Sequence, residues 1–160
     1  MVIKMKYLKA VLTALLISVV FTSCSSDNKN VDFDPSAAVN EIVSSVEMSS
    51  MAEVGSDRLN SYIDIDQSEI EKYSMYICGS GGFADEVAVF KMKSADSASK
   101  LKDLLAERIE KRKVDFKDYN PDEFTKLENA MITVKGNFVF VSVTGDNDTA
   151  ESIFLKYYNG

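Results

Sequence analysis

The sequence predicts an α+β domain: a four-stranded antiparallel sheet formed by two strand–strand–helix repeats, with an extra N-terminal helix. Two observations support this fold class. Residues 73–113 and residues 130–158 each contain two β-rich runs followed by apolar residues at helical spacing. A third apolar run at helical spacing, over residues 39–46, precedes both repeats. We expect the helices of the repeats to cover one face of the sheet and the N-terminal helix to cover the other.

The N-terminal helix is expected to begin at Pro35, because the side chain of Asp34 can cap free backbone amides and proline suits the first helical position. Its apolar stripe consists of Val39, Ile42, Val43 and Val46. Residues 47–62 lack a regular apolar spacing, so we interpret them as a frayed helix end and a loop.

The first repeat begins with a hairpin. Its two strands are expected at residues 73–78 and 86–93, separated by the glycine cluster of residues 79–82. This cluster lacks the Gly-Lys-Ser/Thr ending of a phosphate-binding loop and leads into a strand instead of a helix, so we do not interpret it as one. A helix from Ser94 to about Lys113 follows. Its apolar arc consists of Ala98, Leu101, Leu104, Leu105 and Ile109.

The second repeat follows a short helix that is expected to start at Asn120 and Pro121. Its strands are expected at residues 130–134 and 138–143. The Gly136-Asn137 pair between them is typical of a two-residue hairpin turn.

The last helix is expected to open with a capping box formed by Asp148 and Glu151. Its inward residues are Ala150, Ile153, Phe154 and Tyr157. The inner strands are apolar on both faces because their side chains alternate. We expect one face to carry Phe90, Met92, Phe138 and Phe140, and the other to carry Val89, Val139 and Val141.

The composition excludes several classes of function. The 160 residues include no histidine, which removes zinc hydrolases and every Ser-His-Asp or Cys-His arrangement. The formal net charge is −7, and phosphate binding needs clustered Lys and Arg, so nucleic acid is not an expected partner. No catalytic constellation and no cofactor motif is recognised, and we expect no cofactor.

The first residues have the plan of a signal peptide. Three lysines, at positions 4, 6 and 9, precede an apolar run over residues 10–21, which is shorter than the roughly twenty residues of a membrane-spanning helix. The run ends in Phe21-Thr22-Ser23-Cys24, which resembles the lipobox of bacterial lipoproteins. This resemblance implies cleavage before Cys24 and a diacylglyceryl group on its sulfur. The alternative is an ordinary secreted protein that is cut near Ser23.

We therefore expect three parts: a lipoprotein signal peptide (1–23), a lipidated cysteine with a flexible tether (24–34), and a single globular domain (35–160). The lipid on Cys24 would hold this domain at the extracytoplasmic face of the bacterial cell membrane. Cys78 would then be the remaining thiol. Its apolar neighbours, with no basic residue among them, predict a buried and inert side chain.

Two arginines are candidate anion-binding residues. On the helical wheel of residues 94–113, Arg112 lies near the middle of the apolar arc and Arg108 lies on its edge. An unpaired buried charge costs several kcal/mol, so each guanidinium group must reach solvent or an anionic partner. One interpretation is a structural ion pair with an acid such as Asp118 or Glu86. The other is a pocket that binds a carboxylate or a phosphate.

A metal site is not predicted. Asp64, Asp66 and Ser68 have the alternating spacing of a calcium loop. However, Glu69 stands where the sharp turn needs glycine, and Met75 stands where the bidentate glutamate belongs.

Several short motifs together resemble one family. The motifs are residues 86–91, the basic residues Arg108, Lys111 and Arg112, and residues 116–123, 127–130 and 135–138. In this order they resemble a family of bacterial lipoproteins, common in Bacillota, that is catalogued as domain of unknown function 4358. The resemblance covers roughly residues 35–158 and includes the lipobox. It implies no activity, cofactor or partner.

Three hypotheses of function follow. The first is a membrane-anchored, non-catalytic binding or interaction module of the cell envelope, with an envelope protein or a second copy as partner. The second is a lipoprotein that captures a small anion or solute through Arg108 and Arg112. The third is a carboxylate-dependent envelope hydrolase, which the 25 acidic residues allow but no marked pair supports.

Overall fold

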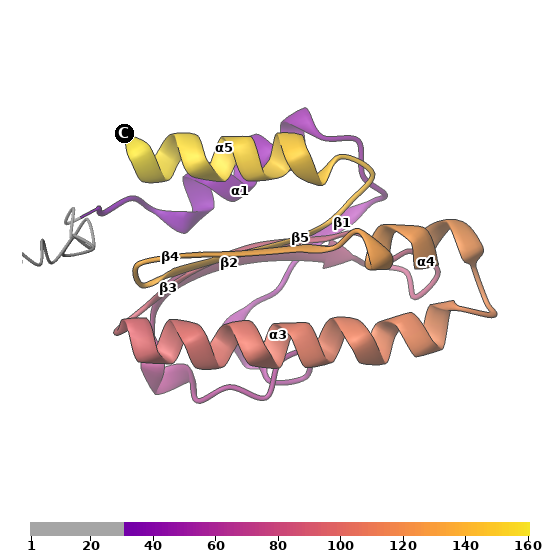
Figure 1. Ribbon diagram of the computed structural model, residues 1–160, viewed down its shortest axis with the longest axis horizontal. Coiled ribbons are helices and arrows are strands. Elements are labelled where there is room, and N and C mark those ends of the chain that lie inside the picture. The colour runs from indigo at the N-terminus through magenta and orange to yellow at the C-terminus, as the bar shows by residue number, and fades with distance from the viewer. Residues whose placement is uncertain (1–30) are drawn as a thin grey trace, which may run out of the picture.

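The structure, a computed structural model, describes residues 31–160 and contains a five-stranded antiparallel sheet with helices on both faces (Figure 1). The predicted signal peptide and Cys24 lie outside the described residues. The strands are β1 (Met51–Glu53), β2 (Ile70–Cys78), β3 (Glu86–Met92), β4 (Met131–Lys135) and β5 (Phe138–Val143). Their order across the sheet is β1-β2-β3-β5-β4, and all neighbours are antiparallel. The predicted α+β class with an antiparallel sheet is confirmed.

The prediction of four strands is wrong, because β1 adds a fifth. This strand lies within residues 47–62, which the sequence pattern indicated as a helix end and a loop. Its three residues are too few to show an alternating pattern, and two of them are exposed. They form a strand because Met51 pairs with Cys78 and Glu53 pairs with Tyr76 along the edge of β2. This pairing is a tertiary contact that local sequence does not encode.

The helices are α1 (Pro35–Ser45), α2 (Ser56–Leu59), α3 (Ala95–Phe116), α4 (Pro121–Glu128) and α5 (Asn147–Asn159), with a 3-10 turn at Gln67–Glu69. Figure 1 shows α3 on one face of the sheet and α1 with α5 on the other. The helices of the two repeats therefore lie on opposite faces, and the expectation of one shared face is wrong. The N-terminal helix does lie opposite α3, as expected, but it shares its face with α5.

The strand register explains this difference. Residues directly opposite each other in neighbouring strands project to the same face. Phe90 pairs with Val139, and Val89 pairs with Phe140. Each face therefore receives rings from one central strand and valines from the other, which corrects the predicted separation into a phenylalanine face and a valine face. Both faces need a helical cover, and each repeat supplies one.

The two covered faces form two hydrophobic cores. On the α3 face, the central strands and α3 bury Ala88, Phe90, Val139, Val141, Leu101, Leu105 and Ile109. On the α1/α5 face, the central strands and the two helices bury Val87, Val89, Phe138, Phe140, Val39, Ile42, Ile153 and Phe154. Among residues 31–160, no helix combines the length and the apolar character needed to cross a bilayer.

Most helix starts agree with the sequence signals. Asp34 Oδ1 accepts a hydrogen bond from the Ser36 amide (3.0 Å), so the predicted cap of α1 is confirmed. The helix predicted to end near Lys113 continues to Phe116. The last helix is capped two residues earlier than predicted, because Asp146, not Asp148, accepts from the Thr149 amide. The two-residue turn is confirmed, with Gly136 at a φ of +58° that favours glycine.

Candidate functional site

A buried charged network lies at the start of β3. The side chain of Glu86 is fully buried on the α3 face, and its Oε2 atom accepts from both Arg108 and Arg112, the latter at 2.9 Å. The two arginines can reach one carboxylate because they are four residues apart on α3 and therefore project from the same side of the helix. Of the two acids that the sequence analysis named as pairing partners, Glu86 is the one that binds them.

The arginines are largely shielded from water. Their side chains are only 16% and 18% exposed. Arg112 also donates to the backbone carbonyl of Ala84 (3.0 Å). Burial lowers the pKa of Arg112 from its ordinary value, partly offset by the charge of Glu86. The second carboxylate oxygen of Glu86, Oε1, is buried and has no hydrogen-bond partner within the described part of the chain.

A second cluster continues the network on α4. The ammonium of Lys126 lies 3.0 and 3.1 Å from the two carboxylate oxygens of Asp85 and 2.9 Å from Glu123. Glu123 accepts from the backbone amide of Ala84 (2.6 Å), and Asp85 accepts from the amide of Ser49 (3.2 Å). Three consecutive residues, 84–86, thus join α3, α4 and the segment after α1.

Sequence reasoning missed Asp85, Glu123 and Lys126. Two signals could have found them. Two acids stand directly before the apolar strand 87–90, a position where burial demands cationic partners. Glu123 and Lys126 are three residues apart, the spacing of neighbours on a helix.

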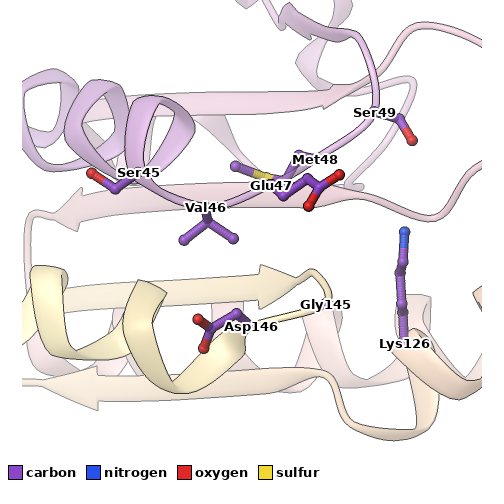
Figure 2. A pocket seen from close by; sticks show the side chains of 8 residues that line it. All are labelled: Ser45, Val46, Glu47, Met48, Ser49, Lys126, Gly145 and Asp146. Carbon is purple, nitrogen blue, oxygen red and sulfur yellow. The ribbon is translucent and has the colours of Figure 1, made fainter.

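The cluster borders a cavity of about 590 Å³ at this end of the sheet. Its walls are Ser45 at the end of α1, residues 46–49 after it, and Lys126, Gly145 and Asp146. Figure 2 shows Lys126 reaching from α4 toward the segment that carries Ser49. A neighbouring cavity of about 470 Å³ shares Lys126, Gly145 and Asp146. The two cavities together surround the loop between β5 and α5.

The charges of the cavity suit binding better than proton transfer. Burial lowers the pKa of Lys126, but its hydrogen bonds to Glu123 and Asp85 outweigh burial and raise the pKa above the ordinary 10.5. Lys126 is therefore charged at neutral pH and acts as a donor, not as a base. The amide of Thr149, which donates to Asp146, lowers the pKa of that carboxyl below its ordinary value. Asp146 is thus an acceptor at neutral pH.

The other predicted residues lie elsewhere. Cys78, the last residue of β2, is half-buried rather than fully buried, and its sulfur lies 3.4 Å from the hydroxyl oxygen of Ser80. Asp66 caps the 3-10 turn by accepting from the Ser68 amide (2.9 Å). Within residues 31–160, no group of three or more potential metal-ligating side chains comes together.

The chain matches the model of a protein family described as domain of unknown function DUF4358 over residues 44–144. This match covers more than half of the chain, so the protein belongs to that family. The matched segment contains the whole network of residues 84–86, α3 and α4, whereas most of α1 and all of α5 lie outside it. No curated protein and no solved structure matches the chain.

Proposed function

We propose that this member of the family is an extracytoplasmic lipoprotein, anchored through Cys24, whose domain is a non-catalytic binding module of the bacterial cell envelope. The observation that carries the proposal is that two features lie at opposite ends of the sheet. The segment that arrives from Cys24 meets the domain at one end of the sheet, and the cavities beside Lys126 lie at the other end.

The proximal end is defined by the contacts of residues 32 and 33. The ring of Phe33 stacks on Phe138, the first residue of β5, with centroids 4.5 Å apart. Asp32 pairs with Lys91 near the end of β3, at 3.0 Å. The turn between β4 and β5 and the last turn of α5 lie at this same end (Figure 1).

The distal end is defined by residues 45–49, 84–86 and 145–146. These segments are the end of α1 with the residues after it, the start of β3 with the residues before it, and the residues after β5. Each is therefore separated from the proximal end by the length of one element. The 22 residues of α3 run between the two ends and span about 33 Å.

Chain length limits where a lipid on Cys24 could place the domain. From residue 24 to residue 31 an extended chain reaches at most about 25 Å. This reach is shorter than the domain, so the proximal end would face the membrane and the distal cavities would face outward. Such a placement suits a module that presents a binding surface to other envelope components.

The anchor is tested by a pair of cysteine variants expressed in the bacterial host. We expect Cys24→Ala to accumulate as an unprocessed precursor without lipid, while Cys78→Ala is processed, lipidated and extracted into detergent like the parent. Intact-mass measurement of the purified chains distinguishes them. A mature parent chain that begins at Cys24 without added lipid mass would overturn the anchor.

The orientation is tested in the same membranes, in a Cys78→Ser background. A membrane-impermeant fluorescent maleimide is attached either to Lys135→Cys at the proximal end or to Tyr119→Cys, which is exposed near the start of α4. Energy transfer to an acceptor lipid should be stronger from position 135. Equal transfer from both positions, with both labelled on whole cells, would overturn the orientation but leave the anchor intact.

The capture of a small anion by Arg108 and Arg112 is a second candidate. A cavity of about 310 Å³ lined by Tyr62, Arg108 and Lys111, among others, supports it. The shared ion pair with Glu86 weighs against it, because an added anion would have to displace a buried carboxylate. Titration of the parent with phosphate and with acetate tests this candidate: saturable binding that is lost in Arg108→Ala would favour it over the binding module.

A further inference from the structure

The two edges of the sheet are unlike each other. The β1 edge has only three residues and carries exposed Glu53, which are features that protect an edge from pairing with other chains. The β4 edge has five residues in continuous register with β5, and Met131, Ile132, Thr133 and Val134 are each half-buried. No other segment in the described part of the chain makes a backbone hydrogen bond to Ile132 or Val134.

The register shows which backbone groups point outward from β4. The Met92 amide donates to the carbonyl of Asn137, so residue 137 faces β3, and Phe138 therefore faces β4. Phe138 pairs with Lys135 across the two-residue turn. Because the direction alternates along a strand, Ile132 and Val134 direct their N–H and C=O groups to the free edge.

The side chains of this edge differ between the two faces. Ile132 and Val134 pack against the core of the α3 face and are partly open to solvent. Thr133 projects to the other face, where its hydroxyl donates to Glu151 of α5. A strand added beside β4 would therefore meet Ile132 and Val134 on the α3 face, and Thr133 together with the half-buried Met131 on the α1/α5 face.

One end of the β4 edge is acidic. Met131 borders the cavity of about 470 Å³, whose walls also include Asp146 and Asp148. The cation that lines this cavity, Lys126, is already paired with Asp85 and Glu123. Asp146 already caps α5, so Asp148 is the carboxylate beside Met131 that a basic side chain arriving along the edge would meet.

We propose that β4 is a docking edge for an extended peptide segment of another protein, added as a sixth strand, with alternating apolar residues and a Lys or Arg placed beside Asp148. This inference rests on the proposed binding module, and the choice of a peptide over a second copy also rests on the proposed lipid anchor. A second copy is a poorer occupant, because antiparallel pairing of two β4 strands would put the two proximal ends at opposite ends of the dimer. Short tethers on one membrane oppose that arrangement.

The test uses the mature lipoprotein purified from host membranes in detergent and a random-peptide phage library as the probe. Enriched peptides are synthesised, and their affinities for the parent and for two proline variants are compared. Val134→Pro removes an outward N–H at the β4 edge. Glu53→Pro removes one at the β1 edge, because the Val54 amide donates to Met75 and its neighbour Glu53 therefore faces outward.

We expect enriched peptides to share alternating apolar residues with a basic residue at one end. Val134→Pro should weaken them about tenfold or more, and Glu53→Pro should not, with similar melting temperatures for both variants. Asp148→Asn should weaken basic peptides several-fold while it leaves melting nearly unchanged.

Three outcomes would overturn the inference. The first is a library without enrichment on correctly lipidated protein, which leaves the anchor intact. The second is enrichment of peptides whose affinity for Val134→Pro equals their affinity for the parent. The domain would then bind peptides, but at a site other than the β4 edge. The third is a parent that elutes as a dimer and a Val134→Pro variant that elutes as a monomer, because a second copy then occupies the edge.

Discussion

The two faces of the sheet are stabilised by different chemistry. On the α1/α5 face, aromatic rings join the elements: Phe140 stacks on Phe154 with centroids 5.0 Å apart, and Phe33 stacks on Phe138. On the α3 face, the apolar core gives way at its distal end to Glu86 with two arginines. One face is covered by two helices of 11 and 13 residues, and the other mainly by one helix of 22.

This difference teaches how a long helix can be fixed on a sheet. Apolar packing is non-directional, so it tolerates small shifts of a helix along the strands. A carboxylate that must receive two guanidinium groups is satisfied in one position only. On the α1/α5 face the directional contact is more exposed: Glu41 of α1 accepts from Lys156 and, at 2.8 Å, from the Tyr157 hydroxyl of α5. This contact joins the two helices to each other, while the ring of Phe33 joins the start of α1 to β5.

The largest expected effect on stability comes from removing the carboxylate that pairs with both arginines on the α3 face. Glu86→Ala leaves two cationic side chains close together without their anion, so we expect the free energy of unfolding to fall by about 3–5 kcal/mol. Denaturant titration measures this change. Glu107→Ala, which removes an exposed partner of Lys111 on the same helix, is the control and should leave the midpoint almost unchanged. A small effect of Glu86→Ala would mean that both guanidinium groups become solvated when the carboxylate is removed.

A smaller effect is expected from the aromatic face. Phe33→Ala removes a half-buried ring that contacts Phe138, Phe154 and Tyr157, so we expect a loss of about 1–2 kcal/mol. Hydrogen exchange should show faster opening of α1, with α3 unchanged. Phe83→Ala, at a ring that is 46% exposed, is the matched control and should change little. Equal opening of α1 and α3 in Phe33→Ala would mean that the two faces unfold as one unit.

The smallest effect concerns acid. The Ser36 amide and hydroxyl, which donate to Asp34, hold the pKa of this carboxyl below its ordinary 3.8. The stability that this ionised cap contributes is present above pH 3.8 and is lost as the pH falls through the lower folded-state pKa. We expect Asp34→Ala to cost about 1 kcal/mol at pH 7 and much less in strong acid. Thermal melting against pH measures the difference.

Two comparisons sharpen this last prediction. Asp34→Asn keeps a capping oxygen without a titrating group, so the stability of this variant should lack the acid-dependent change that Asp34 gives the parent. The first turn of α3 is capped by Ser94, which does not titrate in this range. Acid should therefore loosen the first turn of α1 before that of α3. Simultaneous loss of amide protection in both turns would contradict this order.

Much of the fold follows from local signals. The Gly136 turn, the cap at Asp34 and the apolar arc of α3 were all predictable, because each depends on residues close together in the chain. The position of Arg112 on that arc also predicted an ionic partner. Its identity could not be chosen between Asp118 and Glu86, because the choice depends on how α3 lies across β3.

By itself, the sequence determined the fold class, the two strand–strand–helix repeats and membership in the family, since periodicity and ordered motifs are properties of the chain. Tertiary structure alone decided the fifth strand, the opposite placement of α3 and α5, and the meeting of Lys126 with Asp85. A three-residue strand such as β1 forms only when it pairs with its neighbour. The face on which a helix packs depends on the strand register, which sets the apolar side chains that project to each face. Lys126 and Asp85 are 41 residues apart, and only packing brings them together.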